Sequence, residues 1–237
     1  MGLLMNNQAQ QDNEQKKQLE AALLLALLAW LGRVRRQVRL YQDKFQQLYH
    51  VQNDRLSLQN ILTKHYNQVQ NRFAKRELQR LGIKLDTSEF NNLLNILDLK
   101  ASTRATEQSG YILKTTQKRL DQFGVDQLRQ WETAMKSHFS AVVVNTETQI
   151  IAEETKTDTI GFLQSRGYLN AASKIVRSWV TILDGREREA HFEAFGQQQL
   201  YGQRFLVGGE YLRYPGDPTG SPENILNCRC TLLTELK

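Results

Sequence analysis

The placement of proline and glycine constrains the fold of this chain more than any other feature of its sequence. The three prolines, Pro215, Pro218 and Pro222, lie within eight residues near the C-terminus, and only three of the 14 glycines precede residue 110. Because proline interrupts a helix and internal glycine weakens one, the first half of the chain is free to form long helices. With 237 residues, of which 40% are apolar and 24% charged, the chain can bury a core and is neither collagen-like nor wholly disordered.

Apolar spacing predicts an elongated helical hairpin in the first 80 residues. Apolar residues recur at alternating intervals of four and three, namely at Leu27, Leu31, Val34, Val38, Tyr41, Phe45 and Leu48. This heptad pattern predicts one helix over 13–52, and a second helix is predicted over 55–81 with Gly82 at its C-terminal end. Gly32, inside the first helix, predicts a kink or a close helix crossing.

The remainder of the chain is predicted to change from helices to short strands. Asp86 and Glu89 have the spacing of a capping box and predict a third, shorter helix. Residues 101–110 are predicted to form a connector. Further helices are predicted over 111–139, with a break near Gly124, and over 146–166; strands are predicted at 175–183, 204–207, 210–214 and 228–233, with a hairpin at Gly208–Gly209. The predicted fold is α+β: an elongated N-terminal helical region (1–140) followed by a small C-terminal α+β domain (141–237).

Residues 21–31 form a run that is apolar on every side of a helix. These eleven residues would span only ~16 Å of a ~30 Å hydrocarbon layer, so we expect no membrane span. The run also lies too far into the chain for a signal peptide and lacks a cleavage site. We expect this helix to be buried on several sides by other protein, as part of a core or of an interface for self-association or partner docking. A helix lying on an anionic membrane surface is the alternative. The predicted interface residues are Leu23, Leu24, Leu27, Leu28, Trp30, Leu31, Val34 and Val38.

Positive charge is concentrated in the first half of the chain. Residues 1–120 carry 19 Lys and Arg against 10 Asp and Glu, whereas residues 121–237 carry 12 against 15. A tentative nucleic-acid-binding cluster consists of Arg33, Arg35, Arg36 and Arg39. On a helix, Arg35, Arg36 and Arg39 form a basic ridge suited to phosphates, which predicts sequence-independent, salt-sensitive DNA binding; a solvated helix face is the alternative interpretation.

The most distinctive sequence lies near the C-terminus, in four short blocks: Trp179–Thr181, Asp184–His191, Tyr214–Pro218 and Asn227–Cys230. Trp179 and Thr181 alternate along a predicted strand and therefore share one of its faces. Asp184, beside Gly185, is predicted to accept turn N–H groups and a fork from Arg186 or Arg188, a structural role that we favour over catalysis. The remaining motif residues are His191, Phe205, the stiff turn Tyr214, Pro215, Gly216, Asp217 and Pro218, and the final Asn227, Cys228, Arg229 and Cys230.

The two cysteines, Cys228 and Cys230, are separated by a single residue, so a disulfide between them would be strained. We interpret them as reduced thiols of an intracellular protein. Together with His191 they form an incomplete set of zinc ligands, since zinc sites normally have four ligands and wider cysteine spacing. Zinc binding and small buried hydrophobic side chains both remain open, and no other cofactor is predicted. His50, His65 and His138 lie on predicted helices and are interpreted as packing or solvent-facing residues.

Taken in order, the four blocks resemble the phage Mu F-like head-morphogenesis family, the minor capsid proteins of tailed bacteriophages. The resemblance covers residues 144–233, and Asn145 departs from the arginine that the family usually carries there. It implies a low-copy internal virion protein, associated with the portal vertex, that acts in head morphogenesis and in DNA packaging or delivery. The implied partners are the phage portal protein and packaged double-stranded DNA. The implied location is the capsid interior near the portal, after assembly in the host cytoplasm.

Common catalytic signatures are missing from the sequence. It contains no Gly-x-Ser-x-Gly, no Walker loop, no dinucleotide fingerprint and no His-Glu-x-x-His. We therefore expect a structural protein rather than an enzyme. The alternative function is that of a DNA-binding or ejected internal virion protein that uses its basic N-terminal half.

Overall fold

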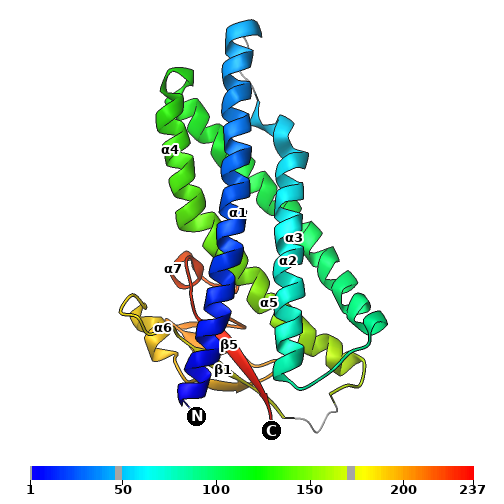
Figure 1. Cartoon of the computed structure of the whole chain (residues 1–237). Helices are drawn as coiled ribbons and strands as arrows, with labels where there is room; N and C mark the ends of the chain where they lie inside the picture. The colour runs from blue at the N-terminus through cyan, green and yellow to red at the C-terminus, as the bar shows by residue number, and fades with distance from the viewer. Residues whose placement is uncertain (1, 46–49, 170–173) are drawn as a thin grey trace.

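The computed structural model describes residues 2–45, 50–169 and 174–237, and within them the predicted α+β fold is confirmed. Long helices come first, and a small β region follows (Figure 1). The helical part consists of α1 (Gly2–Phe45), α2 (Arg55–Arg80), α3 (Thr87–Phe123), α4 (Leu128–His138) and α5 (Val144–Ser165), with the short segments η1 (Val51–Asp54), η2 (Val125–Gln127) and the π-helical η3 (Phe139–Val143) between them.

The β region contains one three-stranded antiparallel sheet and one hairpin. In the sheet, β1 (Ile175–Val180) lies between β2 (Gln198–Leu200) and β5 (Thr231–Leu236). The hairpin pairs β3 (Phe205–Val207) with β4 (Glu210–Leu212) through the predicted glycine turn, and the short helices are α6 (Glu189–Glu193) and α7 (Pro222–Ile225). The strand predicted at 228–233 was placed too early: Cys228 and Cys230 lie in the loop before β5.

The first helix joins the two halves of the molecule. It begins at Gly2 rather than near residue 13, and its N-terminal end lies beside the sheet (Figure 1). There Ala9 is buried in one apolar cluster with Val180, Ile182 and Leu233. The largest core cluster also joins the two halves, because it contains residues of α1 to α4 together with Ile151 and Ala152 of α5. The apolar core therefore continues across the predicted boundary at residue 140.

The helix boundaries agree with the sequence where a specific end signal is present. The Asp86 carboxylate accepts the backbone N–H of Glu89 at 2.9 Å and begins α3, while Gly82 and Gly124 follow α2 and α3 with φ of 69° and 66°. The connector predicted over 101–110 is wrong, because α3 continues through it. The Thr106 hydroxyl donates to the carbonyl of Ser102 at 2.9 Å inside the helix.

The close helix crossing predicted at Gly32 is not found, because no described atom outside the adjoining part of α1 lies within 4 Å of where a Cβ would be.

Most of the large side chains in the apolar run of α1 face the core of their own chain, whereas Leu25 is 69% exposed. Most of the predicted interface residues are fully buried there, and Leu24 and Leu28 are half-buried. The fully buried ones are Leu23, Leu27, Trp30, Leu31, Val34 and Val38. The expectation of a free apolar face for self-association is thus wrong for these residues, because they are buried in the core of their own chain, where α2, α4 and α5 lie against α1. Leu48 lies outside the described residues, and none of the helices within those residues is long and apolar enough to cross a membrane.

Candidate functional site

Residues of the C-terminal blocks meet in a single buried cluster. The Trp179 ring on β1 lies 5.5 Å from the Phe205 ring on β3 and 6.1 Å, edge-on, from the His191 ring on α6. Tyr214, Cys228 and Cys230 belong to the same apolar cluster as Trp179 and Phe205, although the sequence separates these residues by up to about 50 positions. The blocks therefore form the core of the β region.

Thr181 connects the first block to the second and the last. Its hydroxyl donates to the carbonyl of His191 at 2.6 Å and lies 3.5 Å from the Cys230 sulfur. Trp179 and Thr181 are both buried and both contact His191, as residues on one side of the chain would. The strand predicted to carry both is shorter, because β1 ends at Val180 and Thr181 follows it.

Asp184 makes the turn and guanidinium contacts that its position beside Gly185 predicted. Its carboxylate forms an ion pair with Arg229, accepts the backbone N–H of Arg186 at 3.2 Å and accepts the Arg186 guanidinium at 2.5 Å. Hydrogen bonds from Arg229 and Arg186 hold the pKa of Asp184 well below its usual value. Arg188 does not join this fork; its guanidinium donates to the carbonyl of Leu226 instead.

The turn from Tyr214 to Pro218 is built around a buried carboxylate. The Asp217 carboxylate accepts the backbone N–H of Arg213 at 2.9 Å and the backbone N–H of Thr219 at 3.1 Å. It also accepts Nε and Nη2 of the Arg213 guanidinium, at 2.9 and 2.8 Å. Burial acts to raise the pKa of Asp217, but these hydrogen bonds dominate and lower it to about 2.

The same turn is fixed to α5. Gln149 donates from Nε2 to the carbonyl of Pro215 at 3.1 Å. Gly216 has φ of 82°, and a Cβ there would lie 3.0 Å from Cγ of Gln149. Pro218, by contrast, is exposed. The turn is therefore held in place on one side and open to solvent on the other.

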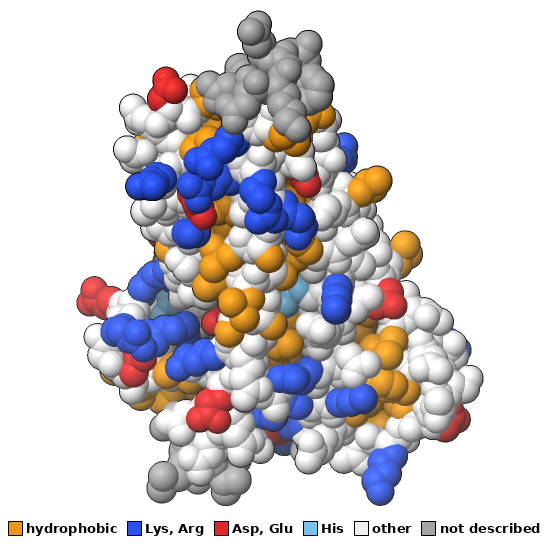
Figure 2. All heavy atoms as spheres, turned by 45° about the horizontal axis from the view of Figure 1, so that its top comes forward, with side chains coloured by type: hydrophobic (Ala, Val, Ile, Leu, Met, Phe, Trp, Pro, Cys, Tyr) orange, Lys and Arg blue, Asp and Glu red, His pale blue; other side chains and the backbone are white. Residues whose placement is uncertain are grey.

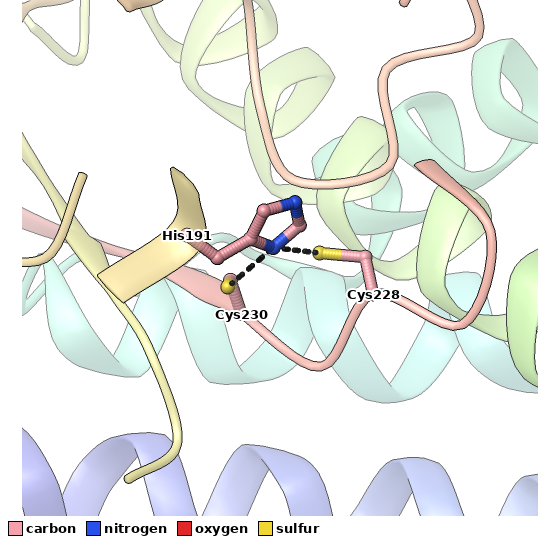
Figure 3. Close-up of side chains that lie close together, drawn as sticks. All are labelled: His191, Cys228 and Cys230. Atoms are coloured by element: carbon pink, nitrogen blue, oxygen red, sulfur yellow. Dashed lines mark hydrogen bonds between the residues drawn. The ribbon is translucent and has the colours of Figure 1, made fainter. Parts of the chain in front are cut away.

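His191, Cys228 and Cys230 form a compact buried group (Figure 3). The imidazole Nδ1 lies 3.3 Å from the Cys230 sulfur and 3.6 Å from the Cys228 sulfur. Both cysteines are free thiols, and Nε2 of His191 finds no hydrogen-bond partner among the described residues. A cavity of about 300 Å³ adjoins the group; its lining includes Asn145, Arg186, Arg188, Asn227 and Arg229.

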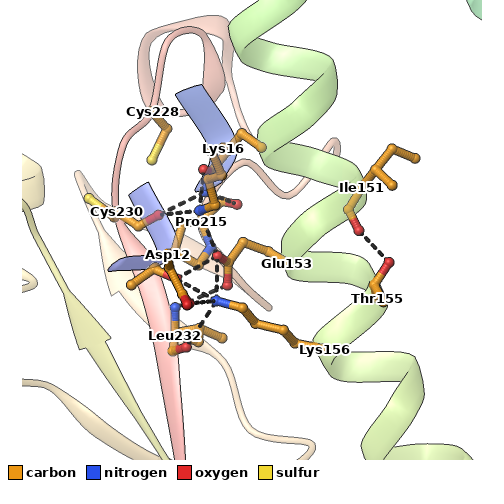
Figure 4. Close-up of polar contacts among 12 residues, drawn as sticks. Asp12, Lys16, Ile151, Glu153, Thr155, Lys156, Pro215, Cys228, Cys230 and Leu232 are labelled. Carbon is orange, nitrogen blue, oxygen red and sulfur yellow. Dashed lines mark hydrogen bonds and ion pairs between the residues drawn. The ribbon is translucent and has the colours of Figure 1, made fainter. Parts of the chain in front are cut away.

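A second buried polar group was not predicted from the sequence (Figure 4). Lys156 on α5 donates to Asp12 of α1 at 2.7 Å and to Glu153 at 2.9 Å, and Lys16 of α1 donates to Glu153 at 2.8 Å. The backbone N–H of Leu232 on β5 also donates to Glu153, at 3.0 Å. This network, which we call the α1–α5–β5 charge network, ties the first helix to the sheet.

The sequence did contain a signal for the charge network. Asp12 and Lys16 continue the four-and-three spacing of the buried residues Leu19, Leu23 and Leu27. A charged side chain at such a position needs a buried partner of opposite sign. That partner lies more than 130 residues away, so its identity was not readable from the spacing.

The predicted basic ridge on α1 is only partly free. Arg35 pairs with Glu132 of α4 at 2.7 Å, and Arg33 donates to the Ser57 hydroxyl at 2.8 Å. Arg36 and Arg39 are exposed, and together with Arg35 they line a hollow of about 530 Å³. Figure 2 shows Lys and Arg side chains gathered on the upper part of this face.

No family model matches the chain, and neither a curated protein nor a solved structure matches it. The family resemblance of the four blocks thus remains a prediction from the sequence.

Proposed function

We propose that this chain is a low-copy internal minor head protein of a tailed bacteriophage, associated with the portal vertex and acting in head morphogenesis and DNA packaging or delivery. One observation carries the proposal: the separated blocks that resemble the family pack around Trp179 as the core of one structural unit. This packing explains why the blocks occur together in one sequence, because each block supplies residues to the same buried cluster.

The helical half is the proposed contact region for the phage portal protein. The polar surface between α1 and α2 is hollowed by a cavity of about 1070 Å³, lined mainly by amide and basic side chains such as Gln15, Asn67 and Arg72. Since the apolar side of α1 is covered by its own chain, contact with the portal would use this polar surface. The proposed location, the capsid interior near the portal, is what the family resemblance implies.

Incorporation into phage heads tests the proposal. Quantitative mass spectrometry of purified heads should find the chain at a few copies per particle, protected from protease until the heads are opened. Trp179→Ala should reduce incorporation because it removes the centre of the buried cluster formed by Trp179, Phe205, Tyr214, Cys228 and Cys230, which we call the motif core. Tyr111→Ala, at a half-exposed aromatic on α3, should not reduce it. A chain absent from purified heads would contradict the proposal.

DNA binding is the second candidate function, favoured by the exposed pair Arg36 and Arg39 beside the hollow on α1. Two phosphate contacts contribute about 1.8 to the slope of log K against log salt. Arg36→Ala combined with Arg39→Ala should therefore flatten that slope by about 2 in duplex DNA titrations. The control removes equal charge at Lys114 and Lys118, which are exposed on α3. Equal slopes for both double variants would refute a role for the ridge.

A further inference from the structure

Two segments far apart in the sequence direct three donor atoms at one point (Figure 3). The short helix α6 supplies His191, and the loop before β5 supplies Cys228 and Cys230. The donor atoms all lie within 4.8 Å of one another, and the three residues are 2–4% exposed. Nδ1 faces both sulfurs, and Nε2 points away from them.

The separations match those of a tetrahedral zinc centre. Zinc–sulfur bonds of about 2.3 Å and zinc–nitrogen bonds of about 2.1 Å at tetrahedral angles place nitrogen and sulfur roughly 3.6 Å apart. The observed distances from Nδ1 are 3.3 Å to Cys230 and 3.6 Å to Cys228. Hydrogen bonding alone fits less well, because Nδ1 either accepts one thiol proton or donates one N–H, while two sulfurs face it.

We propose that His191, Cys228 and Cys230 bind one Zn²⁺ through Nδ1 and the two sulfurs, with a fourth coordination position open to the adjacent cavity. Among the described residues, no further His, Cys, Asp or Glu joins the group, so a water molecule or a small anion completes the coordination. Thiolate and imidazole donors favour zinc over magnesium or calcium. Two thiolates and a neutral imidazole also balance the charge of the ion.

The surroundings hold the proposed ligands in position. The Thr181 hydroxyl fixes the backbone of His191 at 2.6 Å, and the Trp179 ring packs edge-on against the imidazole at 6.1 Å. When Nδ1 binds the metal, the ring proton resides on Nε2, which is buried without a partner among the described residues. A bound water in this polar pocket suits that N–H, as is common for metal-bound histidine.

Metal binding has a defined proton balance. Each cysteine binds as a thiolate, so its thiol proton leaves to solvent when the sulfur–zinc bond forms. Uptake of one Zn²⁺ by the reduced protein therefore releases up to two protons, and no oxidant or reductant takes part. The inference rests on the side-chain cluster alone and is independent of the proposed function.

The test uses the full-length protein, freed of metal by a chelator under reducing conditions. Titration with Co²⁺ should produce thiolate-to-cobalt charge-transfer absorption that saturates at one ion per chain, and Zn²⁺ should abolish it by displacement. Zn²⁺ should also slow the reaction of both thiols with a disulfide reagent and raise the melting temperature. If wild-type protein shows no charge-transfer band and its thiols react equally fast with and without Zn²⁺, the proposal is wrong.

Variants assign the ligands. Cys228→Ser and Cys230→Ser should each weaken Zn²⁺ affinity by more than about 100-fold, and His191→Gln should reduce the affinity while leaving the thiolate band detectable. His50→Gln, at an exposed histidine next to η1 that is not part of the group, is the matched control and should bind as wild type does. Unchanged affinity in the cysteine variants would contradict the assignment, and the wild-type titration decides the question even if a variant does not fold. Absence of the chain from phage heads would leave these results unchanged.

Discussion

Loss of the single carboxylate Glu153 should destabilise the whole protein, because it links α1, α5 and β5. Its side chain is fully buried and lies 2.8 Å from Nζ of Lys16 and 2.9 Å from Nζ of Lys156. It also accepts the Thr231 hydroxyl at 2.7 Å and the backbone N–H of Leu232 at 3.0 Å. The substitution Glu153→Gln preserves the shape of the side chain but leaves two buried ammonium groups without that negative charge.

The expected loss in the free energy of unfolding is about 3–5 kcal/mol, as for other buried ion pairs that lose one partner. The pKa of Glu153 supports this magnitude. Burial acts to raise that pKa, but Lys156 and Lys16 dominate and lower it from 4.5 to about 2. A depression of this size corresponds to about 3 kcal/mol. Urea denaturation at pH 7, followed by circular dichroism, measures the loss, and the melting temperature should fall by about 10 °C.

The pH dependence identifies the charge as the cause. Because the folded-state pKa of Glu153 lies below its unfolded value, its contribution is complete above pH ~4.5 and is lost as the pH falls toward about 2. The difference between wild type and Glu153→Gln should therefore shrink over that range.

The control is Glu132→Gln, which removes a partly exposed carboxylate that pairs with Arg35 and Lys136. It should cost less than about 1 kcal/mol. The reasoning is refuted if both variants lose the same stability at pH 7, or if the Glu153→Gln difference does not change with pH.

Three further predictions concern unfolding free energies measured by urea denaturation. Trp179→Ala should cost about 4 kcal/mol, because it empties the centre of the motif core, and a loss below 1 kcal/mol would contradict its central position. Gly216→Ala should cost about 2 kcal/mol, because alanine is strained at φ of 82° and its Cβ would press on Gln149; Gly185→Ala, with φ of 77° but open space, should cost less. Asp86→Ala should cost about 1 kcal/mol by removing the cap of α3, and an unchanged stability would show that the cap is dispensable.

The sequence was most informative where a residue acts on its own neighbourhood. Asp86 begins α3 and Gly82 and Gly124 follow helix ends because a side-chain cap and a left-handed glycine operate within a few residues. The glycine turn between β3 and β4 was predictable for the same reason. In the candidate site, Arg186 lies two positions after Asp184 in the sequence, and the contact between their side chains was also predicted.

Tertiary packing decided the features that were predicted wrongly or missed. The segment 101–110 looks like a connector in isolation, but Ala101 and Ala105 are small enough to be buried in the core shared with α2 and α5, which favours a continuous helix. The apolar run of α1 suggested an interface with a partner, but most of its large side chains pack in the core of the same chain. Likewise, the ion pair between Lys16 and Glu153 joins residues 137 positions apart, a separation that no local pattern encodes.

The position of the chain in an intact virion tests the central claim most directly. A reconstruction of complete phage heads, computed without imposed icosahedral symmetry, should show density that fits the helical part and the β region of this chain at the inner side of the portal vertex, in a few copies. Heads whose portal vertex lacks such density, together with recovery of the chain as a free-standing cellular catalyst, would contradict the account.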